Sequence, residues 1–179
     1  MNVGTIKGRV WKFGDDISTD LIIAGKYKFK TIDFDELAKH AMEGADSEFA
    51  LKVSEGDIIV AGKNFGCGSS REQAPIVLKR VGVSAIMAKS FARIFYRNSF
   101  NVGLPLIECP EAVDKIKAGQ TVEISLSGGS VMAGGETFSF KPIPAFLMKI
   151  LKDGGLVEHY KKKGSFPWET GKRNSPKKG

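Results

Sequence analysis

The side chains best suited to chemistry gather in one glycine-rich stretch, residues 62–72, which reads GKNFGCGSSRE. A β-branched run of strand type precedes it at 57–61, and apolar residues at three- to four-residue spacing follow it, as one face of a helix requires. Its glycines permit positive φ and close approach of a ligand, and the amides at a helix start favour negative charge. The stretch therefore predicts a catalytic turn that presents Ser69, Ser70 and Arg71 to a carboxylate substrate.

Pro75 indicates where this helix begins. A proline has no N–H to donate, so its would-be acceptor, the carbonyl of residue 71, should lie at or before the helix boundary. We therefore expect the first helical turn to begin near Arg71 or Glu72, with the hydroxyls of Ser69 and Ser70 free in the turn. The alternative from this segment alone is an ordinary serine N-cap followed by a glutamate, which carries no chemistry.

A second polar cluster lies near the N-terminus, where residues 14–20 read GDDISTD and an apolar run follows at 21–23. Taken alone, the cluster is typical of a turn, because Asp and Ser side chains readily bond to their own backbone. It is too compact for the twelve-residue calcium loop and lacks the glutamate that closes one. A calcium site is therefore not predicted, and a turn and a functional site stay as alternatives.

Taken together, the two clusters resemble one family. The stretches at 14–23 (GDDISTDLII), 64–72 (NFGCGSSRE) and 89–98 (KSFARIFYRN) are similar, in order and spacing, to those of the small subunit of isopropylmalate dehydratase, a two-subunit relative of aconitase. Residues 101–106 and 154–157 also belong to the pattern. The resemblance implies an α/β chain with the swivelling β/β/α fold, in which barrel-like strands are flanked by helices. It also implies a hydro-lyase that interconverts 2-isopropylmalate and 3-isopropylmalate by dehydration and rehydration, in leucine biosynthesis.

The resemblance also implies roles for residues at matching positions. Ser69 is implied to be the catalytic base, acting as an alkoxide that helix-start amides and Arg71 stabilise. Ser70 and Arg71 are implied to bind substrate carboxylates, and Arg71 suits this role because its fork donates two parallel bonds. Thr19 and Asp20 are implied to line the cleft, where Asp20 would organise a histidine or a water from the partner.

Such a dehydratase also needs a Lewis acid for the departing hydroxyl. The resemblance implies a four-iron four-sulfur cluster, held by three cysteines of a separate large subunit, in a heterodimer or heterotetramer. This chain has only Cys67 and Cys109, with no CxxC pair, so it forms neither a disulfide framework nor a complete cluster site. We therefore expect no metal on this chain and two free thiols, with Cys67 as a small packed side chain.

The segment after the first cluster leaves the substrate open. In the resembling family this loop meets the variable side group of the substrate, and here it consists of Tyr27, Lys28, Phe29, Lys30 and Thr31. If it is extended, the two aromatic residues share one face and the two lysines the other. The aromatic face favours the apolar group of isopropylmalate, which we prefer. The cationic face favours the extra carboxylate of homoaconitate, and a dimethylmalate-type substrate is a further alternative.

A third polar group lies in the 89–98 stretch and consists of Arg93, Tyr96, Arg97 and Asn98. These residues are suited to orienting the site or contacting the large subunit. Anchoring the local turn is an equally good interpretation.

The net charge of +7 is uneven along the chain. Residues 161–179 contain seven basic residues and one acidic residue, a net +6, which leaves +1 for the other 160 residues. We therefore expect one domain at 1–160 and a basic, flexible tail at 161–179. An RNA-binding module that uses this tail is an alternative function. No recognition motif accompanies the charge, so a nucleic-acid partner is not favoured.

A serine hydrolase that uses Ser69 or Ser70 is the alternative from another enzyme class. It needs a base histidine, and the chain has only His40 and His159. The motif is not a Gly-x-Ser-x-Gly elbow either. Because there is no 18-residue apolar run and no long apolar stretch near the N-terminus, we expect a cytoplasmic protein without a membrane partner.

Hydrophobic periodicity outlines alternating strands and helices, as in an α/β fold. Strands are predicted at 7–13, 57–61, 83–88 and 104–107. Helices are predicted at 33–42, where Asp33 is the cap, after residue 71 and at 145–153, with a short helix or turn at 91–98. Alternation at 121–126 and 136–140 around Gly128-Gly129 predicts a hairpin.

Overall fold

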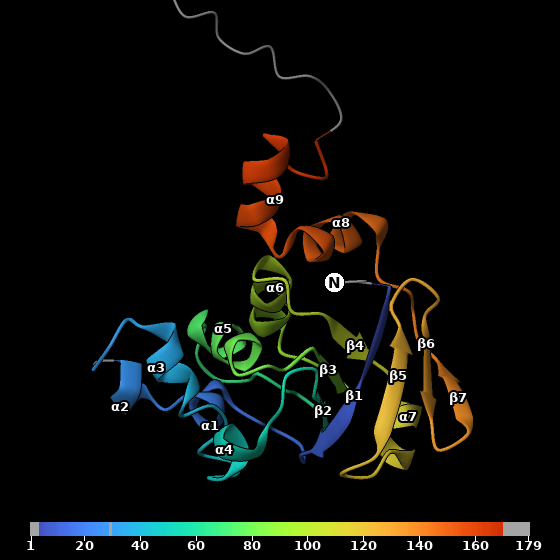
Figure 1. Cartoon of the computed structure of the whole chain (residues 1–179), viewed down its shortest axis with the longest axis horizontal. Coiled ribbons are helices and arrows are strands. Elements are labelled where there is room, and N and C mark those ends of the chain that lie inside the picture. Colours follow the sequence, from blue (N-terminus) through green and yellow to red (C-terminus); the bar gives the residue numbers. More distant parts are fainter. Residues whose placement is uncertain (1–3, 29, 170–179) are drawn as a thin grey trace, which may run out of the picture.

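The computed structural model describes residues 4–28 and 30–169 of the chain. Its centre is a seven-stranded sheet that curls into a half-barrel, with helices packed around it (Figure 1). The strands are β1 (Thr5–Lys12), β2 (Ile58–Ala61), β3 (Ala85–Ala88), β4 (Leu106–Glu108), β5 (Thr121–Ser125), β6 (Ser130–Ala133) and β7 (Glu136–Ser139). This mixed arrangement confirms the predicted fold class.

The helices are mostly short. They are α1 (Thr19–Ile22), α2 (Gly25–Lys28), α3 (Phe34–Ala38), α4 (Phe49–Lys52), α5 (Gln73–Arg80), α6 (Arg93–Asn101), α7 (Pro110–Lys115), α8 (Ala145–Asp153) and α9 (Leu156–Lys163). Among these described helices, none has the length and apolar content that crossing a membrane requires.

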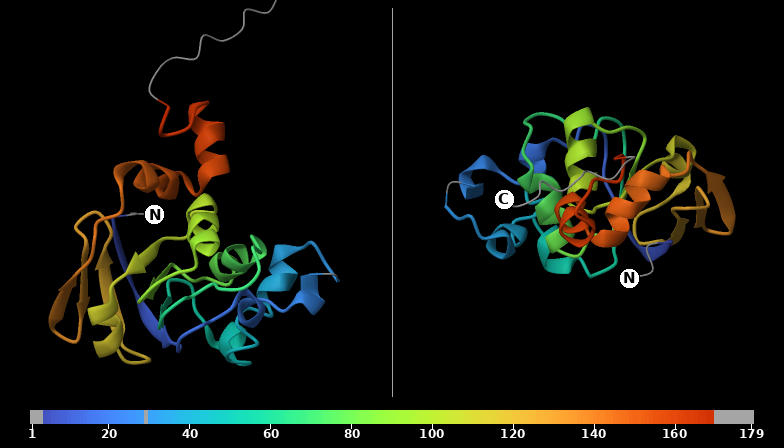
Figure 2. Two further views of the ribbon diagram at one scale, coloured as in Figure 1. Left: turned by 180° about the vertical axis from the view of Figure 1, so that it is seen from behind. Right: turned by 90° about the horizontal axis from the view of Figure 1, so that it is seen from above.

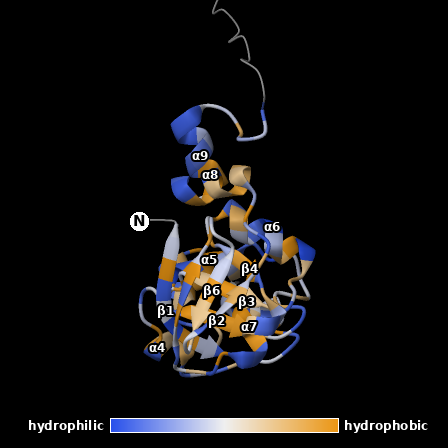
Figure 3. Cartoon of the chain, turned by 90° about the vertical axis from the view of Figure 1, so that its right-hand side faces the viewer, coloured by the Kyte–Doolittle hydropathy of each residue, from blue (hydrophilic) through white to orange (hydrophobic). Residues whose placement is uncertain are grey.

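The sheet joins a parallel half to an antiparallel half through β1. Its strand order is β4-β3-β2-β1-β5-β6-β7; β1 to β4 run parallel, and β5 to β7 continue from β1 as an antiparallel meander. Every residue of β2 and β3 is buried, as expected of parallel strands covered on both faces. Figure 3 shows these strands in the most apolar part of the molecule. The loops that leave the carboxyl ends of β1, β2 and β3 meet at one edge of the sheet, and two of them carry the polar clusters.

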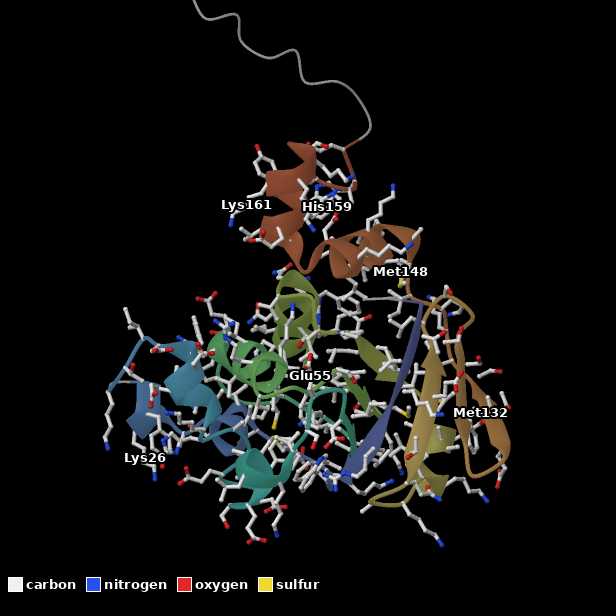
Figure 4. All side chains as sticks on the ribbon, in the orientation of Figure 1. Lys26, Glu55, Met132, Met148, His159 and Lys161 are labelled. Carbon is white, nitrogen blue, oxygen red and sulfur yellow. The ribbon has the colours of Figure 1, made fainter. Side chains whose placement is uncertain are left out.

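Helices position the rest of the molecule around that edge. α1 to α4 form a lobe beside α5, and Lys26 lies at its outer side (Figure 4). α6 packs next to α5, and α8 packs against α6. α9 stands out from the body, as the view from behind also shows (Figure 2, left). Figure 4 places Met148 on α8 and His159 on α9.

Several predicted elements are confirmed at or near their bounds. α8 spans the predicted 145–153, and Asp33 caps α3 by accepting a hydrogen bond from the Asp35 N–H at 2.8 Å. α3 nevertheless ends at Ala38, four residues early. The chain leaves the helix there in tight turns, and Met42 has a left-handed φ of 59°.

The predicted hairpin between 121–126 and 136–140 is wrong. β5 pairs with β6 through the Gly128-Gly129 turn, and β6 then pairs with β7. A second glycine pair, Gly134-Gly135, makes the second turn with positive φ at both residues. The prediction missed β6 because this strand has only four residues between the two glycine pairs.

The predicted boundary between domain and tail falls inside a helix. α9 runs through residue 160 to Lys163, and Gly164 ends it with a φ of 67°. Most of the remaining tail, 170–179, lies outside the described residues, so its flexibility stays a prediction.

Candidate active site

The glycine-rich turn lies between β2 and α5, at the edge where the parallel strands end. α5 begins at Gln73 with Glu72 as its N-cap, and the Glu72 side chain makes no capping hydrogen bond. The helix thus begins slightly later than predicted, because Pro75 needs no acceptor anywhere in the first turn. The alternative of a serine N-cap is wrong, and Ser69 and Ser70 are exposed in the turn.

A concavity of about 410 Å³ opens over this turn. Residues from the turn, from the start of α5 and from one face of α6 line it: Ser69, Ser70, Arg71, Glu72, Gln73, Ile94 and Asn98. The structure therefore brings the three predicted residues of the turn together. Gln73 and Ile94 were not predicted. The four-residue spacing of Ile94 and Asn98, which places both on one helical face, was the available signal.

The N-terminal cluster fastens the turn to the sheet. The Asp15 carboxylate accepts a hydrogen bond from the Lys63 N–H at 2.7 Å, and the Gly66 N–H donates to the Ile17 carbonyl, also at 2.7 Å. A Cβ at Gly62 would lie 1.8 Å from the Asp15 carboxylate, so only glycine permits this approach. The carboxylates of the first cluster thus bond to the second cluster. A purely local turn would not need these contacts.

Thr19 links the two clusters at Ser69 itself. Its N–H donates to the Cys67 carbonyl at 2.8 Å, and its hydroxyl donates to the Ser69 carbonyl at 3.1 Å. Thr19 is only 1% exposed. The hydroxyl therefore fixes the peptide that follows Ser69, which makes Thr19 a positioning residue. Direct contact between Thr19 and a substrate stays a prediction.

Arg71 is oriented from the same segment. Its Nη1 donates to the Asp20 carboxylate and to the Ile23 carbonyl, the latter at 3.1 Å. The Arg71 side chain is 17% exposed and that of Asp20 is 63% exposed. Both contacts use Nη1, so within the described residues Nη2 and Nε stay available for a carboxylate. In this chain Asp20 orients Arg71, and its predicted role toward a partner's histidine or water stays a prediction.

Comparisons with known proteins identify this arrangement. The family model described as the aconitase C-terminal domain matches residues 16–112, which contain most of the first cluster and all of the glycine-rich stretch. The 3-isopropylmalate dehydratase small subunit 1 of Methanopyrus kandleri is 57% identical over 92% of this chain and 97% of that protein. This chain belongs to the 3-isopropylmalate dehydratase small-subunit family. The resemblance drawn from the two clusters is confirmed.

Two further relatives bear on fold and substrate within this family. A crystal structure of 3-isopropylmalate dehydratase from Methanocaldococcus jannaschii matches with a TM-score of 0.84 and 51% identity, covering 89% of this chain and 95% of that one. The methanogen homoaconitase small subunit of Methanothermobacter thermautotrophicus is 55% identical over 89% of this chain and 92% of that protein. Relatives named for two substrates are thus similarly close, and overall identity does not select between them.

The segment predicted to set specificity in this family member is helical at its start. Residues Gly25–Lys28 form α2, so the alternation considered for an extended segment does not apply to them. The Tyr27 hydroxyl donates to the Glu43 carboxylate, 2.7 and 2.8 Å from its oxygens, and the Tyr27 ring stacks on His40 with centroids 3.7 Å apart. Hydrogen bonds from Tyr27 and then His40 hold the pKa of the Glu43 carboxyl below its usual value. Tyr27 is therefore anchored to the lobe.

The same segment borders Arg71. A Cβ on Gly25, the first residue of α2, would lie 3.5 Å from Nη2 of Arg71. The ammonium groups of Lys26 and Lys30 lie 4.7 and 6.0 Å from the Tyr27 ring centroid. Phe29 and the Lys28 side chain lie outside the described part of the structure, so their predicted contacts stay predictions.

The two cysteines are free thiols, as predicted. Cys67 is half-buried in the turn, and burial raises the pKa of the Cys109 thiol, which lies before α7. Over residues 4–28 and 30–169, no group of three or more His, Cys, Asp or Glu side chains is arranged to hold a metal. An iron–sulfur cluster is held mainly by thiolates, three or four of them. The residues of this chain therefore do not fit one.

The histidines do not complete a hydrolase site. His40 Nδ1 is bonded to Glu43 at 2.8 Å, and His159 is buried with its Nδ1 2.7 Å from Asp153. Both histidines lie in the described region, and neither is hydrogen-bonded to Ser69 or Ser70. A serine hydrolase needs such a base beside its nucleophile, so the geometry disfavours that class.

Proposed function

We propose that this chain is the small subunit of a hydro-lyase that interconverts 2-isopropylmalate and 3-isopropylmalate by dehydration and rehydration, in leucine biosynthesis. The observation that carries the proposal is the exposed Ser69-Ser70-Arg71 turn, which Thr19 and Asp20 hold in the lining of a concavity. The names of relatives that are 57% and 55% identical support the same reaction.

In this proposal Ser69 is the base that takes the proton from the substrate carbon. The electrons of that C–H bond form the double bond as the hydroxyl leaves the neighbouring carbon, and addition of water in the other orientation gives the isomer. A serine hydroxyl is a weak base unless its anion is stabilised. The amide groups at the start of α5 and the guanidinium of Arg71 supply that stabilisation.

Arg71 binds a substrate carboxylate in the same proposal. Nη1 is held by Asp20 and the Ile23 carbonyl, so the guanidinium plane is fixed before substrate arrives. Nη2 and Nε then donate to the carboxylate as a fork, a geometry that a lysine cannot reproduce. Ser70, next to Ser69 in the turn, is assigned a second contact to a carboxylate.

We assign the iron–sulfur cluster and the remaining catalytic groups to a large subunit. The cysteines of this chain do not fit a cluster, while its catalytic turn is exposed on one face. A partner must therefore cover the turn to exclude water from the reaction. The complex would be a heterodimer or a heterotetramer.

A homoaconitase small subunit is the second candidate, because a relative of that name is 55% identical and because Lys26 and Lys30 lie beside Tyr27. We prefer isopropylmalate, since most of the most similar relatives carry that name. The test is kcat/KM for isopropylmalate, homoaconitate and dimethylmalate, before and after Lys28→Ala and Lys30→Ala. A preference for homoaconitate that collapses in either variant would reassign the substrate.

The experiment that tests the reaction is reconstitution. The purified chain should show no turnover of isopropylmalate alone and should gain it when mixed anaerobically, under reducing conditions, with a cluster-loaded large subunit. Turnover by this chain without a partner would refute the proposed division of roles. Esterase activity or tight RNA binding by the isolated chain would favour the hydrolase or the nucleic-acid module instead.

A further inference from the structure

Two arginines on α6 have no carboxylate partner among the residues that the structure describes. Arg93 and Arg97 are four residues apart and exposed, and their side chains make no hydrogen bond or ion pair with any described residue. The other three arginines of the described region are each paired with an acid: Arg9 with Asp57, Arg71 with Asp20 and Arg80 with Asp35. The α6 pair therefore stands out as unmatched positive charge.

The two arginines flank a small concavity with an aromatic floor. Its volume is about 290 Å³, and it is lined by Phe91, Arg93, Tyr96, Arg97 and Glu108. The Phe91 and Tyr96 rings are half-buried, with centroids 6.2 Å apart. Two cations against one carboxylate leave the rim positive. An apolar floor with a cationic rim suits an acidic side chain on an aliphatic stem, and Tyr and Arg are the residue types that dominate binding at protein interfaces.

The same helix forms part of the active-site concavity. Ile94 and Asn98 line the space over Ser69 and Arg71, and Ile94 is 52% exposed although it is apolar. Arg93 and Ile94 are adjacent in sequence, so the two concavities lie on either side of one ridge. A body that covers the catalytic turn must also rest on this ridge.

We propose that the α6 ridge, defined as Arg93, Ile94 and Arg97, docks an acidic segment of the large subunit. The inference rests on the proposed function, which requires a partner over the catalytic turn. The unmatched guanidinium groups select an acidic segment, and Ile94 supplies an apolar contact beside the site. Positive charge at the edge of an interface steers association and raises the association rate, and salt weakens this effect.

The test is the affinity of the full chain for the cluster-loaded large subunit, measured by biolayer interferometry at 0.05 and 0.5 M salt. Arg93→Glu/Arg97→Glu should raise Kd at low salt by at least about tenfold, mainly through slower association. At high salt the difference in Kd between the variant and the unmodified chain should be smaller. At saturating large subunit, kcat should stay within about twofold of the unmodified chain.

The matched control is Lys7→Glu/Lys141→Glu, which changes the net charge equally. Both lysines are exposed, and neither lines the concavity over the glycine-rich turn or the one beside Arg93 and Arg97. This control should change Kd by less than about twofold. The neutral variant Arg93→Gln/Arg97→Gln should have a Kd between those of the unmodified chain and the charge-reversed variant. Its circular dichroism spectrum should match that of the unmodified chain, which excludes a folding defect as the cause.

Each outcome separates this inference from the proposed function. If the unmodified chain neither binds the large subunit nor gains turnover, the proposed function fails. If the unmodified chain binds and turns over but the reversed variant binds equally well, only the docking inference is overturned. A reversed variant that keeps full affinity for the large subunit and loses affinity for single-stranded RNA would assign the ridge to nucleic acid and overturn it as well.

Discussion

Gly66→Ala should destabilise the fold through one identifiable contact. Gly66 has a φ of 81°, and a Cβ built on it would lie 2.1 Å from Cγ of Phe95. Phe95 is 2% exposed and packs edge-on against Phe65 with ring centroids 5.4 Å apart, so its ring has little room to move. The Gly66 N–H also holds the turn to the Ile17 carbonyl. The substitution therefore strains the glycine-rich turn.

The magnitude follows from two costs. Left-handed backbone at a residue with a Cβ costs about 1–2 kcal/mol, and overpacking a closed core costs about 1–3 kcal/mol. Together they predict a loss of about 2–5 kcal/mol of unfolding free energy. At about 2–4 °C per kcal/mol for a chain of this size, Tm should fall by roughly 4–20 °C. Thermal unfolding followed by circular dichroism measures this loss.

Gly119→Ala is the matched control. Gly119 has the same φ of 81°, but no heavy atom lies within 4 Å of a Cβ placed there. Gly119→Ala should therefore lower the unfolding free energy only by the cost of left-handed backbone, about 1–2 kcal/mol. The excess loss at Gly66, about 1–3 kcal/mol, isolates the clash with Phe95. Equal losses in the two variants would refute this reasoning.

Three further predictions follow from the site and its supports. Arg71→Lys should lower kcat/KM of the reconstituted enzyme by about 10- to 150-fold, because a lysine cannot form a fork while it also bonds Asp20, and subunit affinity should not change. Thr19→Val should lower kcat by about tenfold, because the Ser69 carbonyl loses its donor, and Thr19→Ser should restore kcat; equal kcat in all three proteins would remove Thr19 from the site. Burial raises the pKa of Asp57, but hydrogen bonds from Ser54, Trp11 and Arg9 outweigh it, so the pKa lies below the ordinary 3.8. Because a depressed pKa stabilises the fold above about pH 3.8 and this contribution is lost on further acidification, urea unfolding should find Asp57→Asn destabilised at pH 7, with a smaller deficit at pH 3.

The sequence predicted the glycine-rich turn before α5 better than the contacts that support it, for physical reasons. The turn is local: glycines, two serines and Pro75 lie within fourteen residues and constrain one another. The bonds from Thr19 to Ser69 and from Asp20 to Arg71 span 50 and 51 residues. A single sequence does not show directly which residues so far apart along the chain will contact each other.

Short elements were the other source of error. α2 has four residues, barely one helical turn, so no helical period repeats along it to distinguish it from an extended segment. The faces of the segment were therefore considered only for an extended conformation, whereas Tyr27 lies in a helical turn, where it stacks on His40 and bonds to Glu43. The buried strands β2 and β3 were predictable because their apolar, partly β-branched runs match their burial on both faces.

The central claim, that Ser69 is the base of a two-subunit hydro-lyase, is tested most directly by kcat of the reconstituted enzyme with Ser69→Ala and Ser70→Ala. Ser69→Ala should lose about 100- to 10,000-fold in kcat, while its affinity for the large subunit and its Tm stay close to those of the unmodified chain. Ser70→Ala should mainly raise KM. Near-normal kcat in Ser69→Ala, with a large loss in Ser70→Ala, would contradict the assignment.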